Sequence, residues 1–439
     1  MLYFLYHRRK ASTAPQGVVN VSTMDFSKIK TAHFIGIGGI GISAIARMFL
    51  LEGKKVNGSD VADSEVTEEL RKLGAQISIG QRAENVLVDC DLVIYTIAIT
   101  PDNPEFAEAK RRGIPLLSYP EALGIISKEK YTIAVSGTHG KTTTTAMIAK
   151  ILMDAGLDPT VIVGSFLLDA KGGRTNFISG KSKYLVVEAC EYRRSFLNLS
   201  PKILVITNID ADHLDYYKNL DDIKSAFAEL AMRVPKDGVV INNFDSISLP
   251  SGFKLKIPGR HNIENAKAAL AVARALKIDD VVALKSLSEF SGTWRRFEYR
   301  GEAKNGALVY DDYGHHPTEI EATFQGARGL FPTQKIIVVF QPHLYSRTKD
   351  HLEEFGKCFA RADAVILLPI YPAREKDPGN ISSQMVVDEI QKNKQSAYFV
   401  KTFAEAAEKA TKFAGSDGII ITMGAGETNK VADILIYQN

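Results

Sequence analysis

The sequence predicts an α/β protein of three domains. We expect a Rossmann-like N-terminal domain, a central ATPase domain of the P-loop type with a mostly parallel sheet, and a Rossmann-like C-terminal domain. Short apolar runs alternate with helical patterns from about residue 31, which is typical of parallel βαβ units. Two of these runs end in a glycine-rich loop that a helix follows. At 439 residues, the chain is also long for a single hydrophobic core.

We expect the domains at residues 25–122, 123–294 and 295–439, after a disordered extension over residues 1–24. In that extension a short apolar stretch precedes the basic residues, which is the reverse of the order in a secretory signal. Met24 stands just before the first regular segment. The extension is therefore not expected to belong to the fold.

The expected elements follow one another in three blocks. The first begins with a strand near residue 31 and a helix through "ISAIARMFLLEG", followed by strands over 55–57, 92–96 and 115–118. The second begins with a strand over 131–135 and a helix from about Lys141, followed by strands in "KYLVVEA", "ILVITN" and "GVVIN". The third contains strands in "ALVYDD", "KIIVVFQ", "AVILLP" and "GIIITMG". Its clearest helix is "TFAEAAEKATKFA", where apolar residues recur at helical spacing.

Composition excludes several classes of function. A net charge of +3 is small for this length, so no nucleic-acid partner is expected. No apolar run approaches the length of a membrane span, so no membrane insertion is expected either. Cys90, Cys190 and Cys358 show no metal or redox spacing, which favours a reducing cytoplasm. A monomer and a homodimer both remain open.

The segment "VSGTHGKTTTTA" resembles a phosphate-binding loop. Gly140, Lys141 and Thr142 match the end of the G-x-x-x-x-G-K-[ST] pattern, but Val135 stands where its first glycine belongs, and the nearest upstream glycine is Gly137. A strand precedes the loop and a helix follows, so backbone N–H groups and the helix N-terminus converge on one anion site. Lys141 can reach the terminal phosphates and the Thr142 hydroxyl can bind Mg²⁺. We favour a shortened ATP loop over a glycine-rich turn with a chance lysine.

An earlier loop, "GIGGIG", carries Gly36, Gly38 and Gly41 in the dinucleotide-binding pattern, with Asp60 placed to bind a ribose. Alone, this pattern predicts an NAD oxidoreductase, but any nucleotide with a diphosphate could bind such a turn. A chain with both loops is more readily explained as an enzyme that joins a nucleotide-linked substrate to another molecule with ATP.

Several segments resemble the Mur ligases, the ATP-dependent amino-acid ligases of peptidoglycan synthesis. They are the loop at 137–143, "TNIDADHLDYY", "GRHNIENAKAA", "GTWRRFE", "DDYGHHPTE" and "QPHLYSRT", and the resemblance extends over about residues 31–428. The last two segments are similar to the branch that adds L-alanine to UDP-N-acetylmuramate. In that branch ATP activates the lactyl carboxylate as an acyl phosphate, which the amine of alanine attacks. Such an activity would serve the cell wall, and through it cell shape and division.

The resemblance implies a set of site residues in each domain. The UDP-sugar would be bound in the first domain by Gly36, Gly38, Gly39, Gly41, Ser43 and Asp60. ATP would be bound by Gly137, Thr138, His139, Gly140, Lys141, Thr142, Thr143, Asn262, Asn265, Arg296 and Asp312. Mg²⁺, which Mn²⁺ could replace, would be held by Thr142, Glu188 and His213. The catalytic residues would be Lys141, His213, Arg296 and Asp312.

Three of these assignments have structural alternatives. Glu188 ends a strand and could be a surface acid, and His213 could be a neighbour of a helix cap. Asn262 and Asn265 flank a predicted helix start and could be caps.

For the amino acid, the resemblance implies Tyr313, His315, His343 and Arg347, with Arg347 pairing with the carboxylate. We expect the adjacent His316 to be structural. The chain departs from many relatives at Leu344, where they carry arginine, and at Cys190, where another version of the family has aspartate. Phe227 stands where sister ligases for later residues carry a carbamylated lysine, which favours the alanine-adding branch.

Four alternatives remain at this stage. Within the family, a recycling ligase that attaches an intact tripeptide shares both glycine loops. Folylpolyglutamate synthase is disfavoured by "GIGGIG". An NAD oxidoreductase leaves Lys141 and His213 unexplained. A regulatory module would bind ATP without releasing phosphate.

Overall fold

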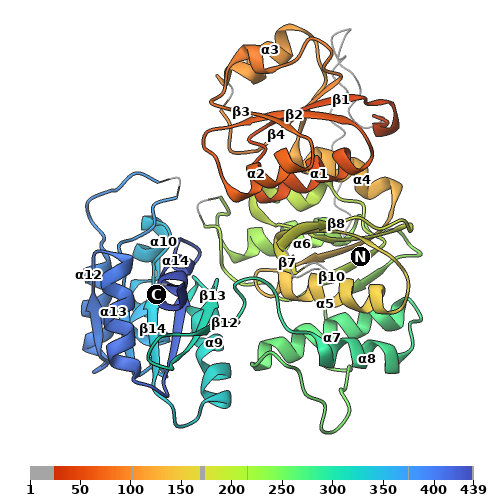
Figure 1. The fold of residues 1–439 in the computed structure, drawn as a ribbon. Coiled ribbons are helices and arrows are strands. Elements are labelled where there is room, and N and C mark those ends of the chain that lie inside the picture. The colour runs from red at the N-terminus through yellow and green to blue at the C-terminus, as the bar shows by residue number, and fades with distance from the viewer. Residues whose placement is uncertain (1–23, 101, 169–173, 215, 374, 438–439) are drawn as a thin grey trace, which may run out of the picture. The chain divides into compact units, whose positions relative to one another are not determined.

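The computed structural model describes residues 24–100, 102–168, 174–214, 216–373 and 375–437, and Figure 1 shows its fold. Three separate sheets are present, which confirms the predicted class of three α/β domains. By its internal contacts the chain divides into two compact units, with the boundary between Glu129 and Lys130. The first unit holds one sheet and the second holds two. The extension expected over residues 1–24 lies outside the described residues except for Met24.

The first unit is a parallel five-stranded sheet of order β3-β2-β1-β4-β5. Phe49 of α1 packs on Phe34 of β1, while Ala109 of α3 packs with the next strand residue, Ile35, on the opposite face. Helices therefore cover both faces, as a parallel sheet requires. Its elements are β1 (Thr31–Ile35), α1 (Ile40–Leu51), β2 (Lys55–Asp60), α2 (Glu65–Lys72), β3 (Gln76–Ile79), β4 (Leu92–Tyr95), α3 (Pro104–Arg111), β5 (Leu116–Ser118) and α4 (Tyr119–Glu129).

The first unit ends later than we expected. We placed the boundary at residue 122, but α4 is one continuous helix from Tyr119 to Glu129, and the unit ends with it. A helix that buries its apolar side chains, such as Leu123 and Ile126, gives no place for a linker in its middle.

The second unit begins with a six-stranded sheet of order β11-β10-β6-β9-β7-β8, parallel except for the β7–β8 hairpin. Helices α5, α7 and α8 lie close to one another beside this sheet (Figure 1), and their apolar side chains form one core with it. Its elements are β6 (Tyr131–Ser136), α5 (Lys141–Asp154), β7 (Thr160–Leu168), β8 (Arg174–Ile178), β9 (Tyr184–Glu188), β10 (Ile203–Ile206), α6 (Leu220–Ala231), β11 (Val239–Ile241), α7 (Arg260–Ala275) and α8 (Asp280–Glu289).

The third sheet has the order β12-β13-β17-β14-β15-β16, and only β12 is antiparallel. Helices α9, α11 and α12 pack on one face and α13 and α14 on the other. Its elements are β12 (Glu298–Glu302), β13 (Leu308–Asp312), α9 (Pro317–Leu330), β14 (Ile336–Phe340), α10 (Tyr345–Asp350), α11 (Leu352–Cys358), β15 (Ala364–Leu367), α12 (Ser383–Lys392), β16 (Ala397–Phe399), α13 (Phe403–Ala414), β17 (Ile419–Met423) and α14 (Asn429–Tyr437).

The expected strands and the helix after each glycine loop are present, but the sequence analysis did not identify β3, β7, β8, β12 and β16. Four of these, β3, β8, β12 and β16, are edge strands, and β12 ("EYRGE") carries charged side chains that an apolar pattern does not reveal. Within the described ranges, every helix is too short or too polar to cross a bilayer.

Candidate active site

The loop after β6 has the geometry that its sequence predicts. Helix α5 begins at Lys141, and Gly137 and Gly140 adopt φ values of +137° and +81°. A side chain at Gly140 would collide with the amide of Asn265, and one at Gly137 with the hydroxyl of Thr207. Only glycine therefore lets this loop pass so close to its neighbours.

Lys141 is folded back over its own loop. Its Nζ donates to the carbonyl oxygens of Gly137 (2.6 Å) and Thr138 (2.9 Å) and lies 3.0 Å from Oε2 of Glu191. Burial alone would lower the pKa of Lys141, but the charge of Glu191 raises it above its usual value. Lys141 is thus a fixed cation at the start of α5, in the loop that the sequence predicts to bind phosphate.

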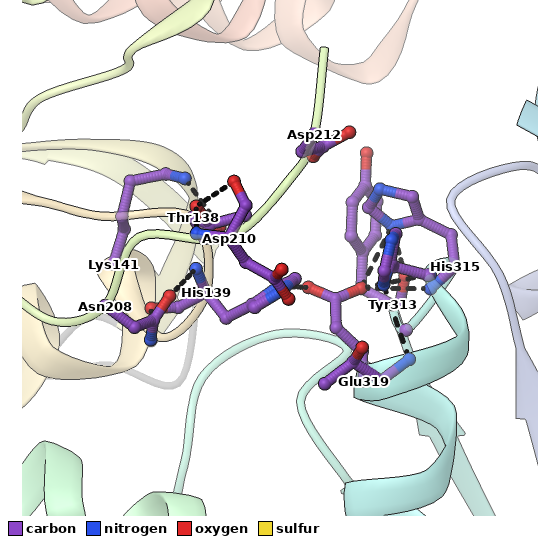
Figure 2. Close-up of polar contacts among 12 residues, drawn as sticks. Thr138, His139, Lys141, Asn208, Asp210, Asp212, Tyr313, His315 and Glu319 are labelled. Carbon is purple, nitrogen blue, oxygen red and sulfur yellow. Dashed lines mark hydrogen bonds and ion pairs between the residues drawn. The ribbon is translucent and has the colours of Figure 1, made fainter. Parts of the chain in front are cut away.

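A second loop, after β10, supports the first (Figure 2). The His139 N–H donates to Oδ1 of Asn208 (2.8 Å), and the Asn208 amide donates to the His139 carbonyl (3.0 Å). The Asp210 N–H donates to the Thr138 hydroxyl (2.9 Å). These reciprocal hydrogen bonds fix the phosphate loop without using Lys141.

Glu319 was missed by the sequence analysis. Its carboxylate lies 3.3 Å from Nδ1 of His139 and 3.9 Å from Nη1 of Arg296, and it accepts from the His315 N–H (3.1 Å). Burial alone would raise the pKa of Glu319, but its interactions with His315, His139 and Arg296 hold it well below its usual value. This carboxylate therefore joins the phosphate loop to α9.

The spacing "HPTE" could have identified Glu319. His316 is the N-cap of α9 and Glu319 stands at its third position, where the two side chains form a reciprocal capping box. This geometry supports the expected structural role of His316.

A cavity of about 470 Å³ lies beside the phosphate loop. It brings together residues that the sequence analysis assigned to ATP, and it adds Phe244, His261, Phe297 and Glu319. The assigned residues that line it are His139, Gly140, Thr142, Thr143, Asn262, Asn265, Arg296 and Asp312.

Asn262 and Asn265 lie inside α7 and do not cap it, because the N-cap is Gly259. The Asn265 amide donates to Oδ1 of Asn262 (3.2 Å), and the Asn262 amide donates to the Pro258 carbonyl (2.6 Å). The capping alternative for these two residues is therefore wrong.

Asp312 is buried on the C-terminal side of the cavity. It accepts from the backbone N–H groups of Phe297 and Gly314, both at 2.8 Å, and burial raises its pKa to about 6. The next residue back, Asp311, lies 2.6 Å from Nε of Arg295, which also donates to the Gly424 carbonyl (2.6 Å). Arg295, also missed from the sequence, anchors the connection that presents Arg296 to the cavity.

The residues expected to hold a metal lie in two groups. The Thr142 hydroxyl donates to Oε2 of Glu188 (3.0 Å), which also accepts from the Gly164 N–H (2.9 Å), so Glu188 is no surface acid. Nε2 of His213 lies 3.7 Å from Oε1 of a different acid, Glu191. A hydroxyl beside a carboxylate fits Mg²⁺, a hard cation that uses few protein ligands when it also binds phosphates.

The residues expected to bind an amino acid gather around Arg347. Its Nη1 donates to Nδ1 of His343 (3.1 Å) and its Nη2 to Oδ1 of Asp212 (3.4 Å). The ring of His315 lies 5.9 Å from that of His343 and 5.5 Å from that of Tyr313. Burial lowers the pKa of His315 to about 4, so its imidazole is neutral at pH 7.

The three departures from relatives have distinct surroundings. Leu344 is buried at the N-cap of α10, with φ +70°, so its side chain packs in the interior. Phe227 is buried against Phe196 with ring centroids 5.2 Å apart. Cys190 is an exposed free thiol between Glu188 and Glu191.

The glycine loop of the first unit follows β1. Gly36 adopts φ +76°, and Asp60 at the end of β2 accepts from the Gly38 N–H (2.8 Å) and the Val61 N–H (2.7 Å). Gly41 faces the ring of Tyr119 so closely that a side chain there would collide with it. Asp60 therefore shapes the loop as well as lying beside it.

Ser43, which we expected to contact the UDP-sugar, is fully buried in α1, and its hydroxyl donates to the Ile40 carbonyl (2.9 Å). A role of its side chain in binding the UDP-sugar stays a prediction.

Three domain families match the chain: the Mur ligase family, catalytic domain (31–131), the Mur ligase middle domain (135–251) and the Mur ligase glutamate ligase domain (295–426). The UDP-N-acetylmuramate–L-alanine ligase of Caldanaerobacter subterraneus subsp. tengcongensis is 42% identical, over 95% of this chain and 99% of that protein. The enzyme of the same name from Clostridium kluyveri is 41% identical, over 95% of this chain and 100% of that protein.

Solved structures agree with these relatives. The UDP-N-acetylmuramate-alanine ligase of Thermotoga maritima superposes with a TM-score of 0.79 at 31% identity, covering 92% of this chain and 98% of that one. A murein peptide ligase of Psychrobacter arcticus shares the fold, with a TM-score of 0.68 at 22% identity over 92% of this chain and 98% of that one.

Proposed function

We propose that this chain, which belongs to the Mur ligase family, joins L-alanine to the lactyl carboxylate of UDP-N-acetylmuramate with ATP. The observation that carries the proposal lies within the second unit, where the loop after β10 contacts both the phosphate loop, through Asp210 and Thr138, and Arg347, through Asp212. The nearly full-length identity with alanine ligases supports this substrate pair over the tripeptide-attaching alternative. Such precursors are made in the cytoplasm, where we place the protein.

The reaction needs an activated acyl group. The carboxylate of the sugar takes the γ-phosphoryl group of ATP, and ADP leaves. The amine of alanine then attacks the acyl carbon, and phosphate leaves from the tetrahedral intermediate as the amide forms. Because the phosphoryl group gains charge at its oxygens, the protein must neutralise that charge and hold the reactants in line.

Residues of this chain meet both needs. Lys141 would neutralise the terminal phosphates once they replace the loop carbonyls as its partners. Arg296, fixed by its neighbour Arg295, faces the same cavity, and Asn262 and Asn265 line the wall where the adenine would lie. Asp312, which lines the same cavity, is suited to the ribose hydroxyls.

The metal site would be formed by the Thr142 hydroxyl and the Glu188 carboxylate, with His213 beside Glu191 as a second position. When bound, Mg²⁺ would supply positive charge at the γ-phosphate, and Mn²⁺ would be a suitable replacement. In the first unit, Gly36, Gly38, Gly39, Gly41 and Asp60 would receive the UDP moiety.

Phosphate release tests the function directly. With ATP, Mg²⁺ and UDP-N-acetylmuramate, we expect release with L-alanine and much less with an intact tripeptide; glycine and L-serine complete the panel. Release with the tripeptide alone would overturn the assignment in favour of a recycling ligase. Release with none of them, together with ATP binding, would favour a regulatory module.

A further inference from the structure

One ion pair in the candidate active site is unlike the others. Nη2 of Arg347 and Oδ1 of Asp212 are 3.4 Å apart, whereas Nε of Arg295 and Oδ2 of Asp311 are 2.6 Å apart. The Arg295–Asp311 pair is buried, and both side chains make further hydrogen bonds, Arg295 to Gly424 and Asp311 to Thr422. The Asp212 side chain is 16% exposed and that of Arg347 11% exposed. The Arg347–Asp212 contact is thus long and partly open to solvent.

Asp212 uses only one of its oxygens. Oδ1 accepts from the His213 N–H (2.7 Å) and from Arg347. Within the part of the chain that the structure describes, Oδ2 accepts no hydrogen bond and lies 3.8 Å from Nε2 of His213. An ionised carboxylate with a vacant oxygen can take a strong donor from a ligand.

L-Alanine is a zwitterion, and its two charges match this pair. Its carboxylate needs a cation such as Arg347, and its ammonium group needs an anion close by. Without the amino acid, Arg347 and Asp212 partly neutralise each other. A zwitterion placed between them would replace the one long contact with two charge-assisted hydrogen bonds.

We propose that Asp212 binds the ammonium group of the amino-acid substrate while Arg347 binds its carboxylate. The inference rests on the proposed function. Asp212 lies on the loop after β10, which also supplies Asn208 and Asp210 to the phosphate loop (Figure 2). Arg347 lies on α10 of the C-terminal domain. This placement turns the amine of alanine towards the phosphate loop, where the activated carboxylate would form.

By holding the ammonium group, Asp212 would position the amino acid and would also select for that group, which an acid with only a structural role would not do. It would select ligands that carry an ammonium group beside the carboxylate. Arg347 would select for the carboxylate alone. Removing either residue should therefore change the ranking of ligands in a different way.

The test compares Asp212→Asn with the wild type. Asparagine keeps an acceptor for the His213 N–H, so the loop should fold, but it lacks the charge. We expect the KM for L-alanine to rise by at least about tenfold, with little change in the KM for ATP. Asp212→Glu should restore part of the loss. Asp221→Asn, on a side chain that is 90% exposed at the start of α6, is the matched control.

L-Lactate separates the two charges, because it has the carboxylate of alanine and a hydroxyl in place of the ammonium group. We measure its competitive inhibition against alanine. Asp212→Asn should leave the inhibition constant of lactate within a factor of about three while alanine weakens at least about tenfold. Arg347→Ala should weaken both ligands.

Three results are decisive. Equal weakening of alanine and lactate in Asp212→Asn would overturn the proposal, because the loss would then be structural. Tighter alanine binding would also overturn it, since Asp212 would then compete with the substrate carboxylate for Arg347. A wild-type protein without alanine-dependent phosphate release would instead overturn the proposed function itself.

Discussion

The two glycine loops share a backbone plan but differ in the charge that each one holds. Both follow a buried parallel strand and lead into a helix, β1 to α1 and β6 to α5. In the first, the carboxylate of Asp60 accepts from the Gly38 N–H. In the second, the ammonium group of Lys141 donates to the carbonyls of Gly137 and Thr138. The first loop is therefore held by a negatively charged side chain and the second by a positively charged one.

This difference decides which part of a nucleotide each loop can receive. A fixed carboxylate repels terminal phosphates and accepts from hydroxyl or N–H groups, as a ribose or a uracil provides. A fixed ammonium group attracts phosphates and stabilises the charge that develops during transfer. The pattern of glycines alone predicts a diphosphate site in both places. We therefore infer that the charged residue at each loop, Asp60 or Lys141, directs the UDP-sugar to the first loop and ATP to the second.

The strongest test of this contrast is Lys141→Ala. We expect ligation to fall by at least about a hundredfold, because a charge that stabilises the transition state is lost. Binding of the UDP-sugar, measured by calorimetry, should be retained. The substitution leaves Glu191 without its cation, so Lys141→Ala/Glu191→Gln and a thermal unfolding curve separate lost catalysis from lost folding. Simultaneous loss of both nucleotides in a folded variant would refute the two-site reading.

A pair of glycine substitutions should divide the two nucleotides. Both Gly140→Ala and Gly36→Ala place an alanine at a left-handed φ. The new methyl group would collide with the Asn265 side chain in the first variant and with the Thr96 side chain in the second. We expect the KM of ATP to rise more than about tenfold in the first and that of the UDP-sugar in the second. Gly53→Ala, at φ +78° with open space around it, is the control for backbone strain alone. A change in both KM values in either variant would contradict the separation.

Asp60→Ala should have a smaller effect. The exposed Val61 N–H can bond to water instead, but the partly buried Gly38 N–H loses its acceptor, which costs about 1–3 kcal/mol. The KM of the UDP-sugar should rise about tenfold and the KM of ATP should not change. Asp60→Asn, which keeps an acceptor, should fall between the two. An unchanged KM in Asp60→Ala would show that the carboxylate serves the turn alone.

The smallest effect is expected from Glu319→Gln. Burial alone would lower the pKa of His139, but Glu319 raises it above its usual value, with Asp210 adding to the rise and Lys141 opposing it. The ring of His316 lies 5.4 Å from that of His139. A raised pKa means that the imidazolium persists below it and is lost as the pH rises through it. The cation would help to hold phosphate.

Without the Glu319 charge, the loss of ATP affinity should move to lower pH, and at pH 7 the KM of ATP should rise only a few-fold. An NMR titration of the His139 ring measures the shift directly. Glutamine at this position can still close the capping box, so α9 should remain intact. Glu321→Gln, an exposed acid on the same helix, is the control. If the pKa of His139 does not change in Glu319→Gln, its value is set by other residues of the two loops and not by Glu319.

The sequence by itself determined the parts of the protein that depend on neighbours along the chain. The buried runs at 31–35 and 131–136, the glycines after them and the helix starts are local features, and the structure has them where the sequence predicts them. Buried apolar strands leave a pattern that can be read. The edge strand β12 leaves none, because its sequence "EYRGE" contains three charged residues and no apolar run. The burial of Ser43 could not be predicted from the sequence, because it depends on how α1 packs.

Only the tertiary structure decided which distant residues act together. Glu319 is 180 positions from His139, and Arg347 is 135 positions from Asp212. Local sequence periodicity predicts neither pair, because each one joins a loop after β6 or β10 to a helix that lies far along the chain. The sequence could name Arg347, Lys141 and Asp60 as charged residues of a site. Their partners, which set what each charge can bind, follow from the fold because Coulombic and hydrogen-bond energies depend on distance in space.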